Sequence, residues 1–247
     1  MTHRIARIVP LVALAAALLP SMSEAEGLRL DLEVGPVWQT RNDFAVPGDT
    51  GTLIRLGDEG PDLAGRVTFV WDVGSHWSLR FLAAPLSTSS SFTSDGEVVF
   101  DDQFFPAGER IVADYTFNSY RAGAFYRFSA SGRWSFRAGG TLKVRDAEIA
   151  LHSAGQKASK TDLGVVPLLY GGARLDLTDS FALDLDVDAA AASQGRAVDA
   201  ALRGELALSR AASAYLGVRV LDGGADNDEV YTFGTFYYTY AGLSWRF

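Results

Sequence analysis

The chain has 247 residues, with 22 lysines and arginines against 30 aspartates and glutamates, so its formal net charge at pH 7 is −8. An acidic chain lacks the basic footprint that nucleic-acid binding needs, and we expect no nucleic-acid partner. It has no cysteine, which excludes a disulfide framework, thiol catalysis and zinc–thiolate sites.

The first 25 residues have the features of a secretory signal. Arg4 and Arg7 give a basic start, an apolar stretch runs from Ile8 to Leu19, and Ser23-Glu24-Ala25 forms a small-x-small cleavage site. The apolar stretch is too short to span a bilayer comfortably. We therefore predict a cleaved signal peptide over residues 1–25, with an uncleaved N-terminal anchor as the alternative, and a single exported unit over residues 26–247.

In that unit the apolar residues are spread at every second position rather than gathered into a run of about 18 residues. Alternation of this kind predicts strands with one apolar face and one polar face. Ten such strands are expected, at 28–39, 66–73, 77–83, 120–128, 134–145, 163–177, 181–189, 198–208, 216–220 and 233–247. The alternation shifts phase near Asp146, which predicts a bulge or a strand leaving the membrane.

The connections between these segments alternate in length. Tight connections are expected at 74–76, 129–133, 178–180 and 209–212, and mostly longer ones at about 41–62, 88–110, 152–160, 193–196 and 222–229. Aromatic residues cluster near the tight connections, namely Trp71, Trp77, Phe81, Phe128, Trp134, Phe136, Phe181, Trp245 and Phe247. A second ring is expected at the other end from Tyr115, Phe117, Tyr231 and Phe233.

The last predicted strand ends on an aromatic residue. Tyr240 is followed by Leu243, Trp245 and Phe247, which alternate with small or polar residues. Such a strand resembles those of bacterial outer-membrane β-barrel proteins, whose assembly machinery reads a C-terminal strand of this kind. The resemblance implies an all-β, transmembrane, antiparallel up-and-down β-barrel of about ten strands, with eight or twelve as alternatives.

The same resemblance implies a location in the outer membrane of a Gram-negative bacterium. It also implies the partners, which are outer-membrane lipid, lipopolysaccharide and the barrel-assembly machinery. Alternation alone does not say which face is inside, because a soluble periplasmic barrel would turn its apolar face inward. We predict the opposite arrangement, because the many charges of the polar face need a wet or ion-paired interior.

On that arrangement the charged side chains of the interior segregate into two walls. The basic wall consists of Arg80, Arg121, Arg127, Arg137, Lys143 and Arg145, and the acidic wall of Asp31, Glu33, Asp184, Asp186, Asp188, Asp199 and Glu205. A ten-stranded cylinder is roughly 20 Å across, so side chains from opposite walls can nearly meet. The expected function is that of a structural or porin-like barrel, its bore plugged by ion pairs or left as a narrow wet path.

One alternative function is an enzyme at the outer rim, either a lipid A-modifying enzyme or an omptin-like hydrolase. Of the three histidines, His3 lies in the signal and His76 in a tight turn, which leaves His152. Its neighbour Ser153 would point to the opposite face of a strand, so the two cannot act as base and nucleophile. We therefore expect no catalytic residue and no cofactor.

The last long connection offers weak candidates for a cation site in Asp222, Asp226, Asp228 and Glu229. Their spacing does not match an EF-hand loop, so a solvated turn is the preferred interpretation. The second long connection is apolar at Phe92, Val98, Val99, Phe100, Phe104 and Phe105, and these side chains are expected to pack on one another or to extend the hairpin. A transporter of small hydrophobic solutes is a further alternative.

Overall fold

The computed structural model describes residues 27–57, 59–129 and 132–247, and the predicted signal peptide lies outside these ranges. All regular structure within them is β-strand. No helix in the described part of the chain is long and apolar enough to cross a bilayer.

The strands are β1 (Leu28–Ala45), β2 (Ile54–Leu56), β3 (Glu59–Val73), β4 (Trp77–Ala84), β5 (Ser87–Thr93), β6 (Val98–Phe100), β7 (Gln103–Phe105), β8 (Arg110–Ser129), β9 (Trp134–His152), β10 (Lys157–Asp176), β11 (Phe181–Ala192), β12 (Gly195–Ala207), β13 (Ala212–Asp226) and β14 (Tyr231–Arg246). They include all ten segments expected from the alternation.

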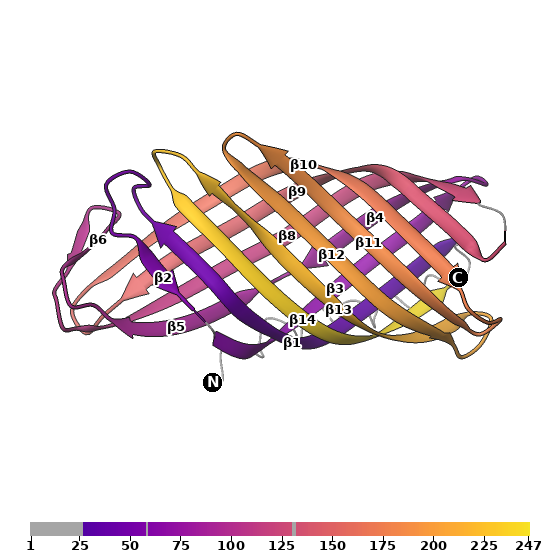
Figure 1. The fold of residues 1–247 in the computed structure, drawn as a ribbon, viewed down its shortest axis with the longest axis horizontal. Coiled ribbons are helices and arrows are strands. Elements are labelled where there is room, and N and C mark those ends of the chain that lie inside the picture. The colour runs from indigo at the N-terminus through magenta and orange to yellow at the C-terminus, as the bar shows by residue number, and fades with distance from the viewer. Residues whose placement is uncertain (1–26, 58, 130–131) are drawn as a thin grey trace.

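These strands form a closed antiparallel barrel with ten positions in its wall (Figure 1). The order is β1-β3-β4-β8-β9-β10-β11-β12-β13-β14, and β14 pairs back with β1. β5 continues the line of β4, since both lie along β8, at 110–116 and 119–126 respectively. The predicted fold class and strand number are confirmed.

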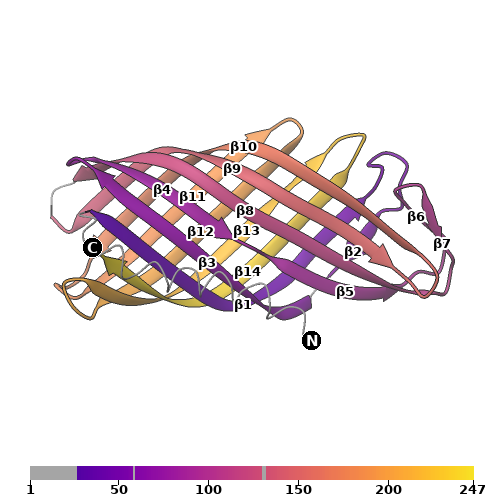
Figure 2. The ribbon, with the colours of Figure 1, turned by 180° about the vertical axis from the view of Figure 1, so that it is seen from behind.

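The barrel closes along a seam between the first and last strands (Figure 2). β1 and β14 pair from Arg29↔Arg246 to Ala45↔Tyr231, with one bulge between Gln39 and Arg41. The seam extends past the strand ends, because the Phe247 amide donates to the Leu28 carbonyl over 2.9 Å.

The two ends of the barrel differ. The first and last barrel strands begin and end at one end, where all connections are short, and we call it the turn end. The other end carries β2 and the separate β6–β7 hairpin, and we call it the loop end (Figures 1 and 2). Only the two loop-end connections that contain these elements are long. The connections expected at about 152–160, 193–196 and 222–229 shorten to 153–156, 193–194 and 227–230, because the strands extend further than the alternation indicated.

The apolar face of the strands points outward. Leu185 is 41% exposed, whereas the neighbouring Asp184 is 1% exposed. Outward aromatic side chains form a ring near the turn end, with Trp71, Trp77 and Phe128 about half exposed. The predicted arrangement, with the apolar face out and charges in the bore, is confirmed over the soluble alternative.

An apolar core fills part of the barrel at the loop end. Phe44, Phe100, Phe105, Ile111 and Leu151 are fully buried there. Phe100 meets Phe44 edge to face, with ring centroids 6.1 Å apart. The second long connection thus packs its apolar side chains together, except for Phe104, which is 54% exposed.

This core corrects two expectations. Tyr115 and Phe117 do not join an outer aromatic ring, because both pack against the core. Nor is there a bulge near Asp146, because β9 pairs without a register shift with both β8 and β10. Ile149 and Leu151 keep the inward positions of the strand. The alternation changes because the interior becomes apolar there while the outer face becomes polar at Asp146 and Glu148, which fits the other expectation, a strand leaving the membrane.

Candidate functional site

The middle of the bore is crossed by a connected set of ion pairs. The set, here called the loop-end network, consists of Arg66, Arg80, Arg121, Arg219, Glu33, Asp188 and Asp199. Its members come from seven strands around the wall, namely β1, β3, β4, β8, β11, β12 and β13. Four guanidinium groups and three carboxylates give the loop-end network a formal charge of +1.

Two carboxylates hold the loop-end network together. Asp188 accepts from Arg80 at 2.6 Å, from Arg121 at 2.8 Å and from the Thr141 hydroxyl at 2.9 Å. Asp199 accepts from Arg121 at 2.7 Å and Arg219 at 2.8 Å, and from Arg66 at 3.1 Å. Arg121, with a side chain only 1% exposed, therefore joins both centres.

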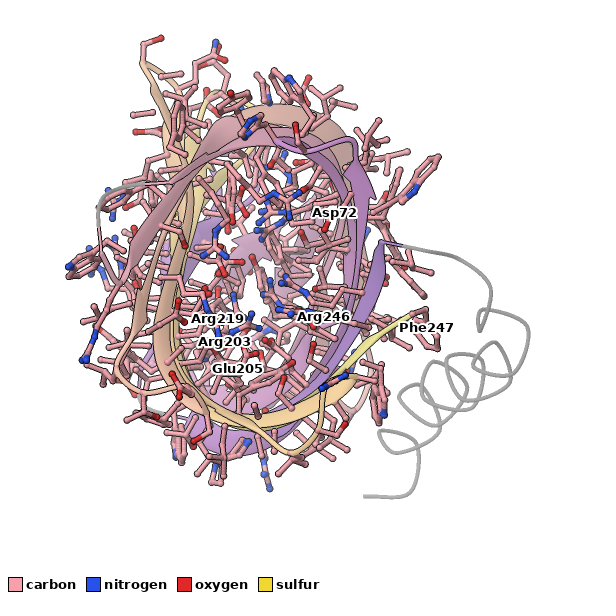
Figure 3. All side chains as sticks on the ribbon, turned by 90° about the vertical axis from the view of Figure 1, so that its right-hand side faces the viewer. Asp72, Arg203, Glu205, Arg219, Arg246 and Phe247 are labelled. Atoms are coloured by element: carbon pink, nitrogen blue, oxygen red, sulfur yellow. The ribbon has the colours of Figure 1, made fainter. Side chains whose placement is uncertain are left out.

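A second set lies nearer the turn end. This turn-end network consists of Arg29, Arg137, Arg174, Arg203, Asp31, Asp176, Asp184, Asp186 and Glu205. Four cations and five carboxylates give it a formal charge of −1. Viewed from the turn end, Arg203, Arg219 and Glu205 project into a bore that is filled with side chains (Figure 3).

The sequence-predicted wall residues all lie on inward positions of their strands, and most are in these two networks. Arg127 instead pairs with Asp72 at 2.9 Å near the turn end, and Arg145 pairs with Asp162 on β10. Lys143 belongs to no ion pair among the described residues and lies 4.4 Å from the Phe117 ring centroid.

Sequence reasoning left Arg66, Arg174 and Arg219 out of the walls, although each occupies the polar face of a predicted strand. Their positions in the alternation were sufficient to place them in the bore. A pattern of two segregated walls has no place for them, because arginines in fact occur almost all around the barrel.

A cavity of about 460 Å³ occupies the bore between the loop-end network and the loop end. Lys143 lies on its lining together with Tyr115, Phe117, Leu221 and Phe236. Small residues of β11, Ala190 to Ala192, also line it. A volume in the range of roughly 300–1,000 Å³ is usual for small-molecule sites.

The wall of the barrel is incomplete beside this cavity. β10 pairs with β9 along its whole length, from Lys157 to Leu175. Its pairing with β11 covers only Leu169–Asp176 and Ala182–Ala189. Between Leu169 and the loop end, β10 therefore has one unpaired edge within the described strands, and Ala190–Ala192 of β11 pair only with β12.

Pro167 stands where the pairing of β10 with β11 stops, two residues beyond the Leu169↔Ala189 pair. Proline has no N–H to give to a ladder and is confined to edges and irregularities of sheets. Val166 and Pro167 on one side of the gap, and Ala190–Ala192 on the other, both line the cavity. The cavity therefore lies against the stretch of wall in which β10 and β11 are not paired.

The histidine considered for catalysis pairs with an aspartate. His152 Nε2 lies 2.9 Å from Asp114 Oδ2, at the loop end of β9 and β8. The Ser153 hydroxyl has no hydrogen-bond partner in the described part of the chain, so it does not form a nucleophile–base pair with His152. The pair alone lacks the third group of a catalytic triad.

The weak cation candidates are dispersed. Asp222 lies in β13 and accepts from Arg196 at 2.6 Å, and the Asn227 side chain caps the following turn. Within residues 27–57, 59–129 and 132–247, no three His, Asp or Glu side chains are grouped as metal ligands.

The large side chains at the end of the last strand, β14, do not all lie on one face. Leu243 is 43% exposed on the outer surface, on the same face of β14 as Trp245, whereas Tyr240 points into the bore and is 6% exposed. The Tyr240 ring packs edge to face on Tyr215, and the Arg219 guanidinium lies 5.2 Å from its centroid.

Solved structures with a similar fold are barrels of the bacterial outer membrane. The outer membrane protease OmpT from Escherichia coli is 8% identical to this chain and superposes with a TM-score of 0.58. The match covers 91% of this chain and 98% of the OmpT chain. This chain has the fold of a bacterial outer-membrane β-barrel. The match to an outer-membrane β-barrel confirms the predicted resemblance at the level of the fold and carries over no activity.

Weaker matches include two further outer-membrane β-barrels. Ail of Yersinia pestis is 13% identical, with a TM-score of 0.40 and coverage of 90% of this chain and 99% of its own. The translocator domain of the autotransporter NalP from Neisseria meningitidis is 12% identical, with a TM-score of 0.44 and coverage of 98% and 97%. No family model matches the sequence, and no curated protein does.

Proposed function

We propose that this protein is an integral outer-membrane β-barrel whose bore is closed, and that it acts as a structural, non-enzymatic membrane protein. An outward apolar belt supports the membrane location. On β9 it extends from Trp134 to the exposed Asp146, which accepts a hydrogen bond from Asn118. The thirteen residues from Trp134 to Asp146 in a tilted strand rise by roughly 30 Å, close to the thickness of a hydrocarbon core.

The loop-end network is the observation that supports a closed bore. The side chains of its four arginines, Arg66, Arg80, Arg121 and Arg219, are each at most 9% exposed. Each guanidinium group contacts a carboxylate from another strand. A ten-stranded barrel is near the size at which side chains fill the interior. We therefore expect the partnered charges that span this interior to block a continuous water path for an ion.

Planar-bilayer conductance tests the closed bore. The wild-type protein is expected to give no steady conductance. The Asp188→Ala/Asp199→Ala variant removes the two centres of the loop-end network, so its arginines repel one another and the bore is expected to conduct anions. Asp72→Ala, which breaks the exposed pair with Arg127, is the matched control and should behave like wild type.

Folding of each variant is checked by the shift in gel mobility on heating that folded barrels show. Steady wild-type conductance of porin size would contradict the proposal, whatever the variants do.

The non-enzymatic part of the proposal is supported by the Ser153 hydroxyl, which makes no hydrogen bond to His152 or to any other described residue. Overproduction of the protein is expected to leave the lipid A mass profile and the cleavage of basic peptides unchanged. An activity that His152→Ala abolishes would replace this proposal with that of a rim enzyme.

The surroundings in the proposal are outer-membrane lipid and lipopolysaccharide, and the partner during biogenesis is the barrel-assembly machinery. The side chains of Leu243 and Trp245 on the last strand point outward, where lipid or another protein can contact them. This orientation supports the proposed lipid surroundings and the proposed assembly partner.

A further inference from the structure

Among the described residues that line the cavity above the loop-end network, Lys143 is the most deeply buried charged residue without an ion-pair partner. Glu148, Lys160 and Glu229 also line the cavity without an ion pair to a described residue, but they are partly or fully exposed. Lys143 is 3% exposed, and its ammonium makes no ion pair or hydrogen bond with any described residue. The Lys143 ammonium lies over the face of the Phe117 ring, 4.4 Å from its centroid. A buried ammonium is costly unless an anion compensates it, and here the free space beside it is the cavity.

The surroundings of Lys143 add positive charge rather than remove it. The charged groups that act most strongly on Lys143 are Arg121, Asp199, Arg145 and Arg66. Asp199 is already bonded to three arginines, and Arg145 is paired with Asp162. Elsewhere in the cavity wall, acidic and basic side chains are mixed, namely Glu148, Asp162, Asp222 and Glu229 with Lys160 and Arg196. The loop-end network carries a formal charge of +1 and Lys143 adds another, so the floor of the cavity favours a negatively charged group.

The rest of the cavity wall is mostly apolar. Tyr115, Phe117, Leu221 and Phe236 line it beside the small side chains of Ala190–Ala192. Its volume of about 460 Å³ corresponds to roughly 15 water volumes, which is room for a single chain of about that many heavy atoms and not for a two-chain lipid.

The outer side of the unpaired stretch between β10 and β11 is apolar. Leu163, Val165 and Leu169 of β10 are 66–78% exposed on the outer surface beside the gap. Pro167 pairs with Leu142, four residues toward the turn end from the exposed Asp146, which places the gap about 10 Å inside the apolar belt. A molecule dissolved in the outer leaflet therefore meets the gap directly.

From these four observations we infer that the cavity binds a single-chain carboxylic acid, which enters from the outer leaflet between β10 and β11. Lys143 holds the carboxylate, and the aromatic and alanine walls hold the chain. The loop-end network is the floor, so the bound molecule stops there and does not cross the bore. This inference rests on the closed bore of the proposed function, and conductance tests that closure separately.

Titration calorimetry with dodecanoate on the purified, detergent-solubilised protein tests the site. The wild type is expected to bind dodecanoate at one site and to bind methyl dodecanoate at least about tenfold more weakly, because a charge-assisted bond is lost. Lys143→Met keeps the length of the side chain and removes the charge. It is expected to weaken dodecanoate by the same factor and to leave the methyl ester unchanged.

Lys157→Met is the matched control, since Lys157 is an exposed lysine outside the cavity. Equal affinity of the wild type for the acid and the ester would overturn the inference. So would undiminished dodecanoate binding by Lys143→Met.

The route is tested by closing the gap. If the β10–β11 ladder continued, Pro167 would lie opposite Ala191, and the absence of natural cysteines makes a Pro167→Cys/Ala191→Cys pair unambiguous. In lipid nanodiscs, oxidation of this pair is expected to slow capture of bilayer-dissolved dodecanoate by about fivefold or more, and reduction should restore it.

Capture of water-soluble hexanoate through the loop end serves as the internal control and should not change on oxidation. Ala190→Trp fills the inner side of the gap without a cross-link and provides the same comparison if the disulfide does not form. Unchanged capture of dodecanoate with the gap closed by either means would overturn the lateral route.

Discussion

Arg121 is the residue on which the loop-end network depends most. It bonds Asp188 at 2.8 Å and Asp199 at 2.7 Å with a side chain that is almost fully buried. Arg121→Met keeps most of the volume but leaves two buried carboxylates with less compensation. We expect it to lower the free energy of unfolding in lipid vesicles by about 3 kcal/mol, as measured by urea titration with tryptophan fluorescence.

Arg127→Met is the comparison for Arg121→Met. Arg127 also pairs with an aspartate, but both side chains are 36% exposed near the turn end. Exposed pairs contribute little, so the expected loss is below about 1 kcal/mol. Equal losses for the two variants would show that burial does not strengthen the loop-end network.

At the residue scale, sequence reasoning could predict which face a charged residue occupies but not which partner it meets. The alternation puts Arg66 and Asp199 on inward faces of strands whose contact in the bore has no sequence signal. Their bond spans a sequence separation of 133 residues. It depends on the stagger of the strands around the barrel, which no local pattern encodes.

The β6–β7 hairpin is the element whose packing is most easily tested. Phe100 is fully buried against Phe44, whereas Phe104, in the facing strand, is 54% exposed. Phe100→Ala is expected to cost about 3 kcal/mol of local stability. The barrel should stay folded, because the hairpin is a separate two-stranded sheet, but limited proteolysis should now cut within residues 94–109.

Phe104→Ala removes the same side chain from an exposed position and should leave the cleavage pattern unchanged. Resistance of Phe100→Ala to protease would contradict the packing described for the loop end.

At the element scale, the ten strands were predictable because lipid and the polar bore impose opposite preferences on alternate residues. The phase shift near Asp146 has the same origin. Of the two expected explanations, the register of β9 excludes the bulge, and the end of the apolar belt at Asp146 agrees with a strand leaving the membrane. Alternation reports the polarity of the two surroundings, and the interior becomes apolar at Ile149 and Leu151 without any change in strand geometry. The gap between β10 and β11 had a single sequence hint, Pro167, which the alternation of its neighbours concealed.

The orientation of the whole molecule can be measured on living cells. The chain has no cysteine, so one introduced cysteine reports its own location. Ala154→Cys, in the β9–β10 connection at the loop end, is expected to react with a membrane-impermeant maleimide on intact cells. Asp179→Cys, in the β10–β11 turn, should react only after the outer membrane is permeabilised.

Labelling of Asp179→Cys but not Ala154→Cys on intact cells would show the barrel to be inserted the other way round. Labelling of neither, in a protein that is present and folded, would contradict an outer-membrane location.

At the scale of the whole molecule, the seam imposes an order of events on biogenesis. β1 and β14 are the most distant strands in the chain order, yet they are immediate neighbours in the wall. Until both strands are paired, a partly assembled sheet has two edges with unpaired backbone N–H and C=O groups, which hydrocarbon cannot solvate. We therefore expect pairing of β1 with β14 to be the final step of assembly. Before that step, the two sheet edges of the open precursor have to be shielded from lipid.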